Sequence, residues 1–159
     1  MADYVVIRSD LLETIDETWA YYTAKFIGVR EIRVRGVAIS IQFAADEIHL
    51  FTEKITAGQT PSPDKLVYRP KSSEVRYFSK TRARLLDRIV ATLENPAGSV
   101  DAKERGGIMV FGPVDRDGQR LAVVVYQRDE RWLVRTAFPL TPKAFMAYKR
   151  SNRSSPWPP

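Results

Sequence analysis

The residue best suited to acid–base chemistry is His49, the only histidine in this chain of 159 residues. Histidine exchanges protons near neutral pH, so His49 is a candidate general acid or base. Glu53 follows four positions later, and on a helix this spacing brings a carboxylate within hydrogen-bonding reach of the imidazole. The plainer interpretation, a surface histidine without a catalytic role, stays open beside it.

Arg82 is a second unusual residue, because it interrupts an apolar helix face. We expect Ser79–Asn95 to form one helix, with Ser79 as its N-cap and Pro96 just beyond its end. Its buried residues should be Leu85, Leu86, Ile89, Val90 and Leu93. Arg82 lies one turn before Leu86, so it must reach water, pair with a carboxylate or contact a ligand. A phosphate there would also meet Lys80 and the free N–H groups at the start of the helix.

Several common catalytic motifs are missing, and this narrows the chemistry. The chain has no glycine-rich phosphate loop, no cysteine and no serine nucleophile with a recognisable base partner, and one histidine makes a zinc site unexpected. Arg, Lys, His, Glu, Thr and Tyr remain. They suit RNA cleavage by the 2′-hydroxyl, because the substrate supplies the nucleophile and the protein orients it, moves protons and stabilises charge on phosphorus. This chemistry predicts no metal and no cofactor.

Positive charge is concentrated in the C-terminal half of the sequence. Residues 1–75 carry 9 Lys/Arg and 11 Asp/Glu, a balance of −2, whereas residues 76–159 carry 16 and 8, a balance of +8. This asymmetry favours a polyanionic partner, with nucleic acid first and acidic lipid or acidic protein second. An ordinary basic surface without a polyanionic partner is the alternative.

The elements that must position these residues begin with a three-stranded unit. Within Gly107–Phe138 the expected strands are Ile108–Phe111, Leu121–Tyr126 and Trp132–Phe138, and the second is apolar throughout and so central. Alternation along the last strand places two sets of residues on opposite faces: Trp132, Val134, Thr136 and Phe138 on one, and Leu133, Arg135 and Ala137 on the other. The arginine in mid-strand predicts a partly open, basic sheet face.

The remaining elements follow from periodicity and end signals. In the N-terminal half, the sequence predicts a strand at Tyr4–Arg8, a helix from Leu11 to about Phe26 capped by Asp10 with Glu13, and a strand-like segment at Glu31–Phe43. The elements expected after it are a helix at Ala44–Ala57, a loop at Gly58–Val75 with a short strand at Leu66–Tyr68, and a helix from Pro142 to Arg150 capped by Thr141. A phase change near Gly36 requires a bulge or a tight turn, and we favour the bulge.

Together these elements predict an α+β fold, a twisted antiparallel sheet with helices packed on one face. Residues 1–150 are expected to form a single domain, and 151–159 a flexible tail unless Trp157 docks on the body. No window is apolar enough for a membrane span, and the N-terminus is charged too early for a secretory signal. We therefore expect a cytoplasmic protein, or one delivered to a target-cell cytoplasm without a cleavable signal.

Four motifs resemble the barnase–EndoU–colicin–RelE group of small ribonucleases, above all its phage-associated and toxin-like members. They are His49 followed by Lys54-Ile55, the basic helix Ser79–Pro96, the apolar strand Leu121–Tyr126, and the closing strand Val134–Phe138. The resemblance implies that His49, Arg82, Arg135 and Thr136 lie near the scissile phosphate. A second histidine found in some members is absent here, so the opposing acid–base role would fall to Glu53, Lys54 or Tyr126.

The function predicted from the sequence is metal-independent RNA cleavage, as a toxin-like effector or phage-derived nuclease. The residues expected to bind the nucleic acid are Lys54, Lys80, Arg120, Lys149 and Arg150. RNA is the expected partner, with an acidic immunity protein or antitoxin as a possible second one. A non-catalytic nucleic-acid-binding module and an interaction domain for an acidic partner protein are the alternatives.

Overall fold

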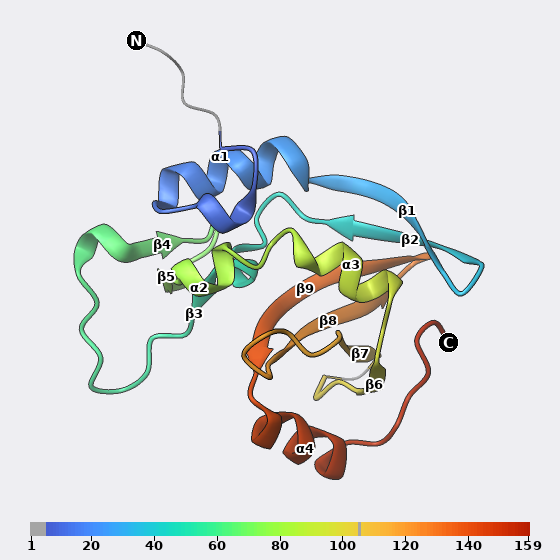
Figure 1. Cartoon of the computed structure of the whole chain (residues 1–159). Coiled ribbons are helices and arrows are strands. Elements are labelled where there is room, and N and C mark those ends of the chain that lie inside the picture. Colours follow the sequence, from blue (N-terminus) through green and yellow to red (C-terminus); the bar gives the residue numbers. More distant parts are fainter. Residues whose placement is uncertain (1–5, 105) are drawn as a thin grey trace.

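The computed structural model describes residues 6–104 and 106–159, and their centre is a six-stranded sheet (Figure 1). Its strands, in the order in which they lie side by side, are β1 (Gly28–Val34), β2 (Val37–Phe43), β9 (Arg131–Leu140), β8 (Arg120–Arg128), β7 (Gly107–Phe111) and β6 (Gly98–Asp101). Neighbours run antiparallel except β2 and β9, which are parallel because the β1–β2 hairpin and the β6–β9 unit meet there. The α+β class is confirmed, and the sheet is mixed.

A small second sheet lies beside the first. Its strands are β3 (Thr52–Glu53), β5 (Val75–Phe78) and β4 (Leu66–Tyr68), paired antiparallel in that order. The short strand expected at Leu66–Tyr68 is confirmed. The helix expected at Ala44–Ala57 is wrong, because this segment holds one 3₁₀ turn, η2 (Ile48–Leu50), and then joins the small sheet through β3. Pairing with β5 outweighs the local helical pattern here.

The N-terminal part differs from the expected elements in three ways. Val6–Arg8 forms no strand, and Tyr4–Val5 lies outside the described residues. The first helix, α1 (Ile15–Lys25), is capped by Thr14 with Glu17 as the reciprocal partner, not by Asp10, because Ser9–Leu11 forms a separate 3₁₀ turn, η1. The bulge favoured at Gly36 is also wrong. Arg35 and Gly36 both have positive φ, which is the geometry of a two-residue hairpin turn between Val34 and Val37.

The segment expected to be one helix is broken into α2 (Lys80–Ala83) and α3 (Arg88–Glu94). The Ser79 cap is confirmed, since its side chain accepts a hydrogen bond from the Arg82 amide. The break occurs where Ser9 intervenes: its hydroxyl donates to the Arg84 carbonyl and accepts from the Asp87 amide. These backbone groups bond to a side chain 75 or more positions away rather than along a helix.

Both faces of the sheet are covered, which is a further difference from the expected arrangement. Along β8, Leu121, Val123 and Val125 pack into the core beneath α1 and α3, while Ala122 and Val124 belong to a smaller core on the opposite face. That smaller core is closed by α4 (Pro142–Ser151), which lies across the sheet from α1 and α3 in Figure 1. Among the described residues, no helix is long and apolar enough to cross a membrane.

The C-terminal segment is held against the body by Trp157. Its indole is almost fully buried, donates a hydrogen bond to the Leu93 carbonyl at 2.9 Å and meets the Trp132 ring edge-on. Before it, the chain runs beside β6, with a bridge between Val100 and Ser154. From the sequence alone, residues 151–159 are expected to form a flexible tail unless Trp157 docks on the body. In the structure, Trp157 is docked.

We expect Trp157→Ala to lower the free energy of unfolding by about 3–5 kcal/mol, the usual cost of removing a buried aromatic side chain. Urea denaturation followed by circular dichroism measures it. Tyr68→Ala is the matched control, because Tyr68 is 66% exposed and its loss should cost within about 0.5 kcal/mol. Equal stabilities of the two variants would contradict the docking of Trp157.

Candidate active site

The site is organised by a β-bulge in β9. Val125 of β8 pairs with Val134 and Val124 pairs with Thr136, so Arg135 is one residue more than the ladder accommodates. Two successive residues of β9 therefore oppose the same part of β8. After the bulge, each side chain of β9 lies on the opposite sheet face from the one that strict alternation would give it. The expected face assignment is wrong beyond Val134 for this reason: Ala137 joins Val134 in the core under α1 and α3, whereas Phe138 packs on the α4 side.

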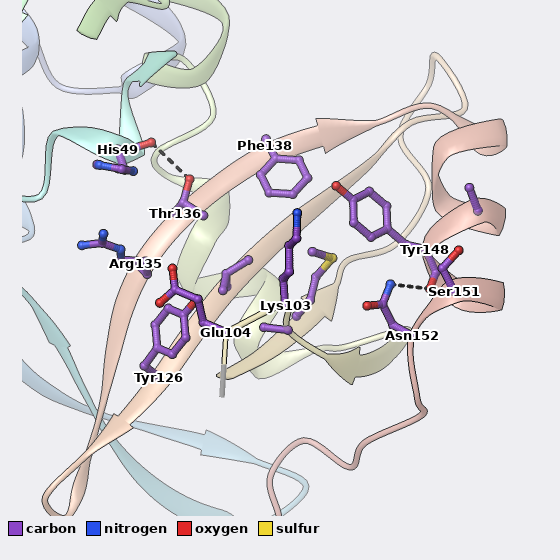
Figure 2. Close-up of a pocket in the computed structure, with 14 residues that line it drawn as sticks. His49, Lys103, Glu104, Tyr126, Arg135, Thr136, Phe138, Tyr148, Ser151 and Asn152 are labelled. Atoms are coloured by element: carbon purple, nitrogen blue, oxygen red, sulfur yellow. Dashed lines mark hydrogen bonds between the residues drawn. The ribbon is translucent and has the colours of Figure 1, made fainter. Parts of the chain in front are cut away.

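Beside this bulge lies a pocket of about 610 Å³ (Figure 2). Its walls come from η2, the loop after β6, strands β7 to β9, and α4, with these lining residues: His49, Ala102, Lys103, Glu104, Met109, Val124, Tyr126, Arg135, Thr136, Phe138, Ala147, Tyr148, Ser151 and Asn152. The structure thus brings together three of the four predicted catalytic residues, His49, Arg135 and Thr136. The Thr136 hydroxyl donates to the His49 carbonyl at 3.3 Å and ties η2 to β9.

His49 is held by an acidic residue that the sequence did not indicate. Its Nε2 lies 2.9 Å from Glu74 Oε2, and the other Glu74 oxygen accepts from Arg69 at 3.2 Å. The expected partner, Glu53, is in β3 opposite Tyr77, because the helix that would have aligned Glu53 with His49 does not form. Glu74 follows a loop without periodicity, so no pattern in the sequence could have paired it with His49.

The environment of His49 favours the neutral imidazole. Burial lowers its pKa below the ordinary value, and the positive charges of Arg76 and Arg135 act in the same direction, while Glu74 opposes them. Burial alone would raise the pKa of Glu74, but the charges and hydrogen bonds of His49 and Arg69 outweigh it and lower the pKa. The result is an ionised carboxylate beside a histidine that is neutral at neutral pH.

Glu47 is a further residue that sequence reasoning missed. It is 1% exposed, and its Oε2 accepts from Arg135 at 3.3 Å. Among the described residues no donor reaches its Oε1, an unusual state for a buried carboxylate oxygen. Burial raises the pKa of Glu47 against the opposing effect of Arg135 and Arg69. Glu47 therefore sets the position of the Arg135 guanidinium, which Figure 2 shows on the same side of β9 as the His49 ring.

Arg82, the fourth predicted catalytic residue, lies next to this pocket and is not part of its lining. It donates to the Thr52 carbonyl at 2.8 Å, and its guanidinium stands 5.7 Å from the centre of the Phe138 ring. Arg76 of β5, which the sequence did not single out, donates to the same carbonyl at 3.2 Å. Burial and the neighbouring charge of Arg82 lower the pKa of Arg76.

The far wall of the pocket adds hydroxyl and amine groups. Lys103 reaches into the space between Phe138 and Tyr148, and Tyr126 lies beside Glu104 (Figure 2). Burial, reinforced by the Glu104 carboxylate, raises the pKa of Tyr126 to about 12, so its hydroxyl keeps its proton at neutral pH. Of the residues expected to oppose His49 in proton transfer, Tyr126 lines the pocket, whereas Glu53 and Lys54 do not.

The five expected nucleic-acid-binding residues lie outside this pocket. Lys80 pairs with Glu13 at 3.3 Å. The Arg120 guanidinium and the Lys149 ammonium both lie over the Phe145 ring, 4.5 and 5.5 Å from its centre. Lys54 follows β3 and Arg150 is near the end of α4, and both are exposed.

Comparison of the chain with protein-family models, with curated proteins and with solved structures found no match in any of the three. The arguments for a function therefore come from the site itself. Within the part of the chain that the structure describes, no three His, Asp or Glu side chains are grouped so as to hold a metal ion.

The lowered pKa of His49 predicts a specific dependence of stability on pH. Below about pH 6.5, the ordinary histidine value, the unfolded chain takes up the proton more readily than the folded one. Stability should therefore fall as the pH falls from about 6.5 towards the folded-state pKa, by about 1.4 kcal/mol for each unit of difference in pKa. Denaturation of wild type and His49→Gln between about pH 5 and 8 tests this.

Comparing the two proteins cancels most of the contribution of Glu47, whose raised pKa acts in the opposite direction at lower pH. The difference in unfolding free energy should be constant above neutral pH and change below it. Parallel curves over the whole range would show that the folded environment leaves the histidine unperturbed.

Proposed function

We propose that this protein cleaves RNA without a metal ion, by attack of the 2′-hydroxyl on the adjacent phosphate. The observation that carries the proposal is the meeting of His49, Arg135 and Thr136 in one pocket, although Thr136 lies 87 positions beyond His49 in the chain. This set combines a proton acceptor, a cation and a hydroxyl. The resemblance to small ribonucleases, drawn from the same residues, supports the proposal and predicts the same chemistry.

His49 acts as the general base in this proposal. When its Nε2–H donates to ionised Glu74, Nδ1 carries the lone pair and can accept the proton of the 2′-hydroxyl. Glu74 is itself positioned by Arg69, so the base is oriented by a second group in the way that catalytic bases usually are. The lowered pKa of His49 keeps the imidazole in the neutral form that a base requires.

Arg135 stabilises the charge that develops on phosphorus. A guanidinium offers five N–H donors in a planar fork. Within the part of the chain that the structure describes, the Arg135 guanidinium makes a single hydrogen bond, to Glu47. The remaining donors can contact phosphate oxygens while Glu47 holds the group in place. Lys103 and Tyr126 are both protonatable groups on the opposite wall, and either can donate the proton that the departing 5′-oxygen needs.

A non-catalytic nucleic-acid-binding role is the second candidate. The observation in its favour is that the functional groups of the pocket are already paired within the protein, His49 with Glu74 and Arg135 with Glu47. In a binding module these pairs would simply form a fixed polar surface. Incubation with RNA in the presence of EDTA separates the two candidates, since cleaved products support the enzyme and an intact but shifted band supports the binding module.

We expect His49→Ala to lower the rate of RNA cleavage by about 10²–10⁴-fold, the usual contribution of a positioned acid or base. The affinity for a 2′-deoxy oligonucleotide should change little. A general base at His49 contacts the 2′-hydroxyl, and this ligand has no 2′-hydroxyl to contact. Arg33→Ala is the matched control, as Arg33 is exposed on the β1–β2 hairpin away from the pocket. Equal cleavage rates for wild type and His49→Ala would remove His49 from the mechanism.

The pH dependence of kcat/KM should identify His49 as a base rather than an acid. Activity should rise with pH through the His49 pKa, which lies below the ordinary value, and then level off. Because Glu74 raises the pKa of His49, Glu74→Gln should move this acidic limb to still lower pH and reduce the plateau. A limb that moves to higher pH, or does not move, would exclude Glu74 as the group that orients the base.

A further inference from the structure

Arg76 and Arg82 converge on one backbone oxygen from different elements. Arg76, on β5, donates Nε to the Thr52 hydroxyl at 2.8 Å and Nη2 to the Thr52 carbonyl at 3.2 Å. Arg82, on α2, donates Nη1 to that same carbonyl at 2.8 Å. Two nitrogens at 3.2 and 2.8 Å from one oxygen are at most 6.0 Å apart, so the two guanidinium groups are neighbours.

Within the described residues, no ion pair balances the positive charge of Arg76 or Arg82. The charges of Glu74 and Glu47 act on Arg76, and that of Glu53 acts on Arg82, from beyond ion-pairing distance. The other arginines at the site are paired, Arg69 with Asp46 and Glu74 and Arg135 with Glu47. Two like charges held together in a half-buried place are unfavourable by themselves, and a bound anion would remove that cost.

The pair also has hydrogen-bond donors to spare. Each guanidinium carries five N–H groups, and bonds to Thr52 use two nitrogens of Arg76 and one of Arg82. Arg76 Nη1 and Arg82 Nε and Nη2 make no hydrogen bond to any residue that the structure describes. Donors from two separate guanidinium planes suit the tetrahedral oxygens of a phosphate better than a flat carboxylate, which takes one fork in its own plane.

The position of the pair connects it with the pocket. Arg82 stands over the ring of Phe138, which lines the pocket. The charge of Arg76 acts on His49, and the charge of Arg135 acts on Arg76. A nucleic-acid strand that places one phosphate at Arg135 therefore has a second cationic group close by, on the side of the small sheet.

We propose that Arg76 and Arg82 form a phosphate-binding subsite that holds a phosphate of the RNA strand next to the one at Arg135. This inference rests on the proposed function for the identity of the strand, but the binding of phosphate itself does not require cleavage. The alternative is that both arginines only brace the backbone at Thr52. A bracing role predicts lost stability on substitution and no special response to phosphate.

The test uses Arg76→Gln and Arg82→Gln, which keep an N–H donor for Thr52 and remove the charge. Arg33→Gln is the control, since Arg33 is an exposed arginine remote from the pair. Thermal unfolding is followed in sodium phosphate and in sodium chloride of equal ionic strength. Phosphate should raise the Tm of wild type and of the control by about 2–4 °C relative to chloride. In both test variants the Tm should be the same in phosphate as in chloride.

The second measurement is the affinity for a single-stranded 2′-deoxy oligonucleotide, which cannot be cleaved by 2′-hydroxyl attack. Each test variant should bind it about ten-fold or more weakly than wild type, because a charge-assisted hydrogen bond is lost. A phosphate effect with unchanged oligonucleotide affinity would overturn the assignment to a nucleic-acid strand. An equal phosphate effect in wild type and test variants would overturn the subsite itself.

These outcomes are distinct from those that test the proposed function. If wild type leaves RNA intact while both measurements depend on Arg76 and Arg82, the subsite stands and RNA cleavage falls. If wild type cleaves RNA and neither measurement depends on the pair, cleavage stands and the subsite falls. Should a glutamine variant fail to fold, Arg76→Lys replaces it, because it keeps the charge but loses the fork and should show a reduced, not a normal, phosphate effect.

Discussion

One extra residue in the β8–β9 ladder determines where the candidate site lies. Without the bulge at Arg135, Thr136 and Phe138 would face the core under α1 and α3 together with Val134. With it, Thr136 reaches the carbonyl of His49, and Phe138 supports the guanidinium of Arg82 on the pocket side. A bulge costs ladder hydrogen bonds, and the well-packed sheet on both sides of β9 supplies the stability that permits it.

Around the bulge, the structure balances buried charges in a chain of contacts. Glu47 holds Arg135, Glu74 holds His49, and Arg69 connects Glu74 with Asp46. A buried ion pair seldom stabilises a fold by much, since removing two charges from water costs about as much as their attraction returns. The same contacts do fix the orientation of the imidazole and the guanidinium. A site that must hold these groups ready for a substrate gains most from such orientation.

Segments with strong local signals were predictable. The three strands of the C-terminal unit, the Ser79 and Thr141 caps and the strand at Leu66–Tyr68 are present as expected. The predicted helices that the structure lacks or breaks were wrong because of tertiary contacts. Ser9 interrupts the helix after Ala83 by bonding to its backbone, and pairing with β5 turns Thr52–Glu53 into a strand within a segment with helical periodicity. In both places a distant partner offered the backbone better hydrogen bonds than its neighbours in sequence.

The sequence by itself determined the α+β class, the apolar central strand and the residue types available for chemistry, because composition and periodicity depend only on neighbours along the chain. It also singled out His49, Arg135 and Thr136, which lie at one pocket. Only the tertiary structure decided the partners of these residues. Glu74 meets His49 across 25 positions and Glu47 meets Arg135 across 88, and Arg76 joins Arg82 through Thr52. Such contacts depend on how strands and loops pack, and no local pattern encodes them.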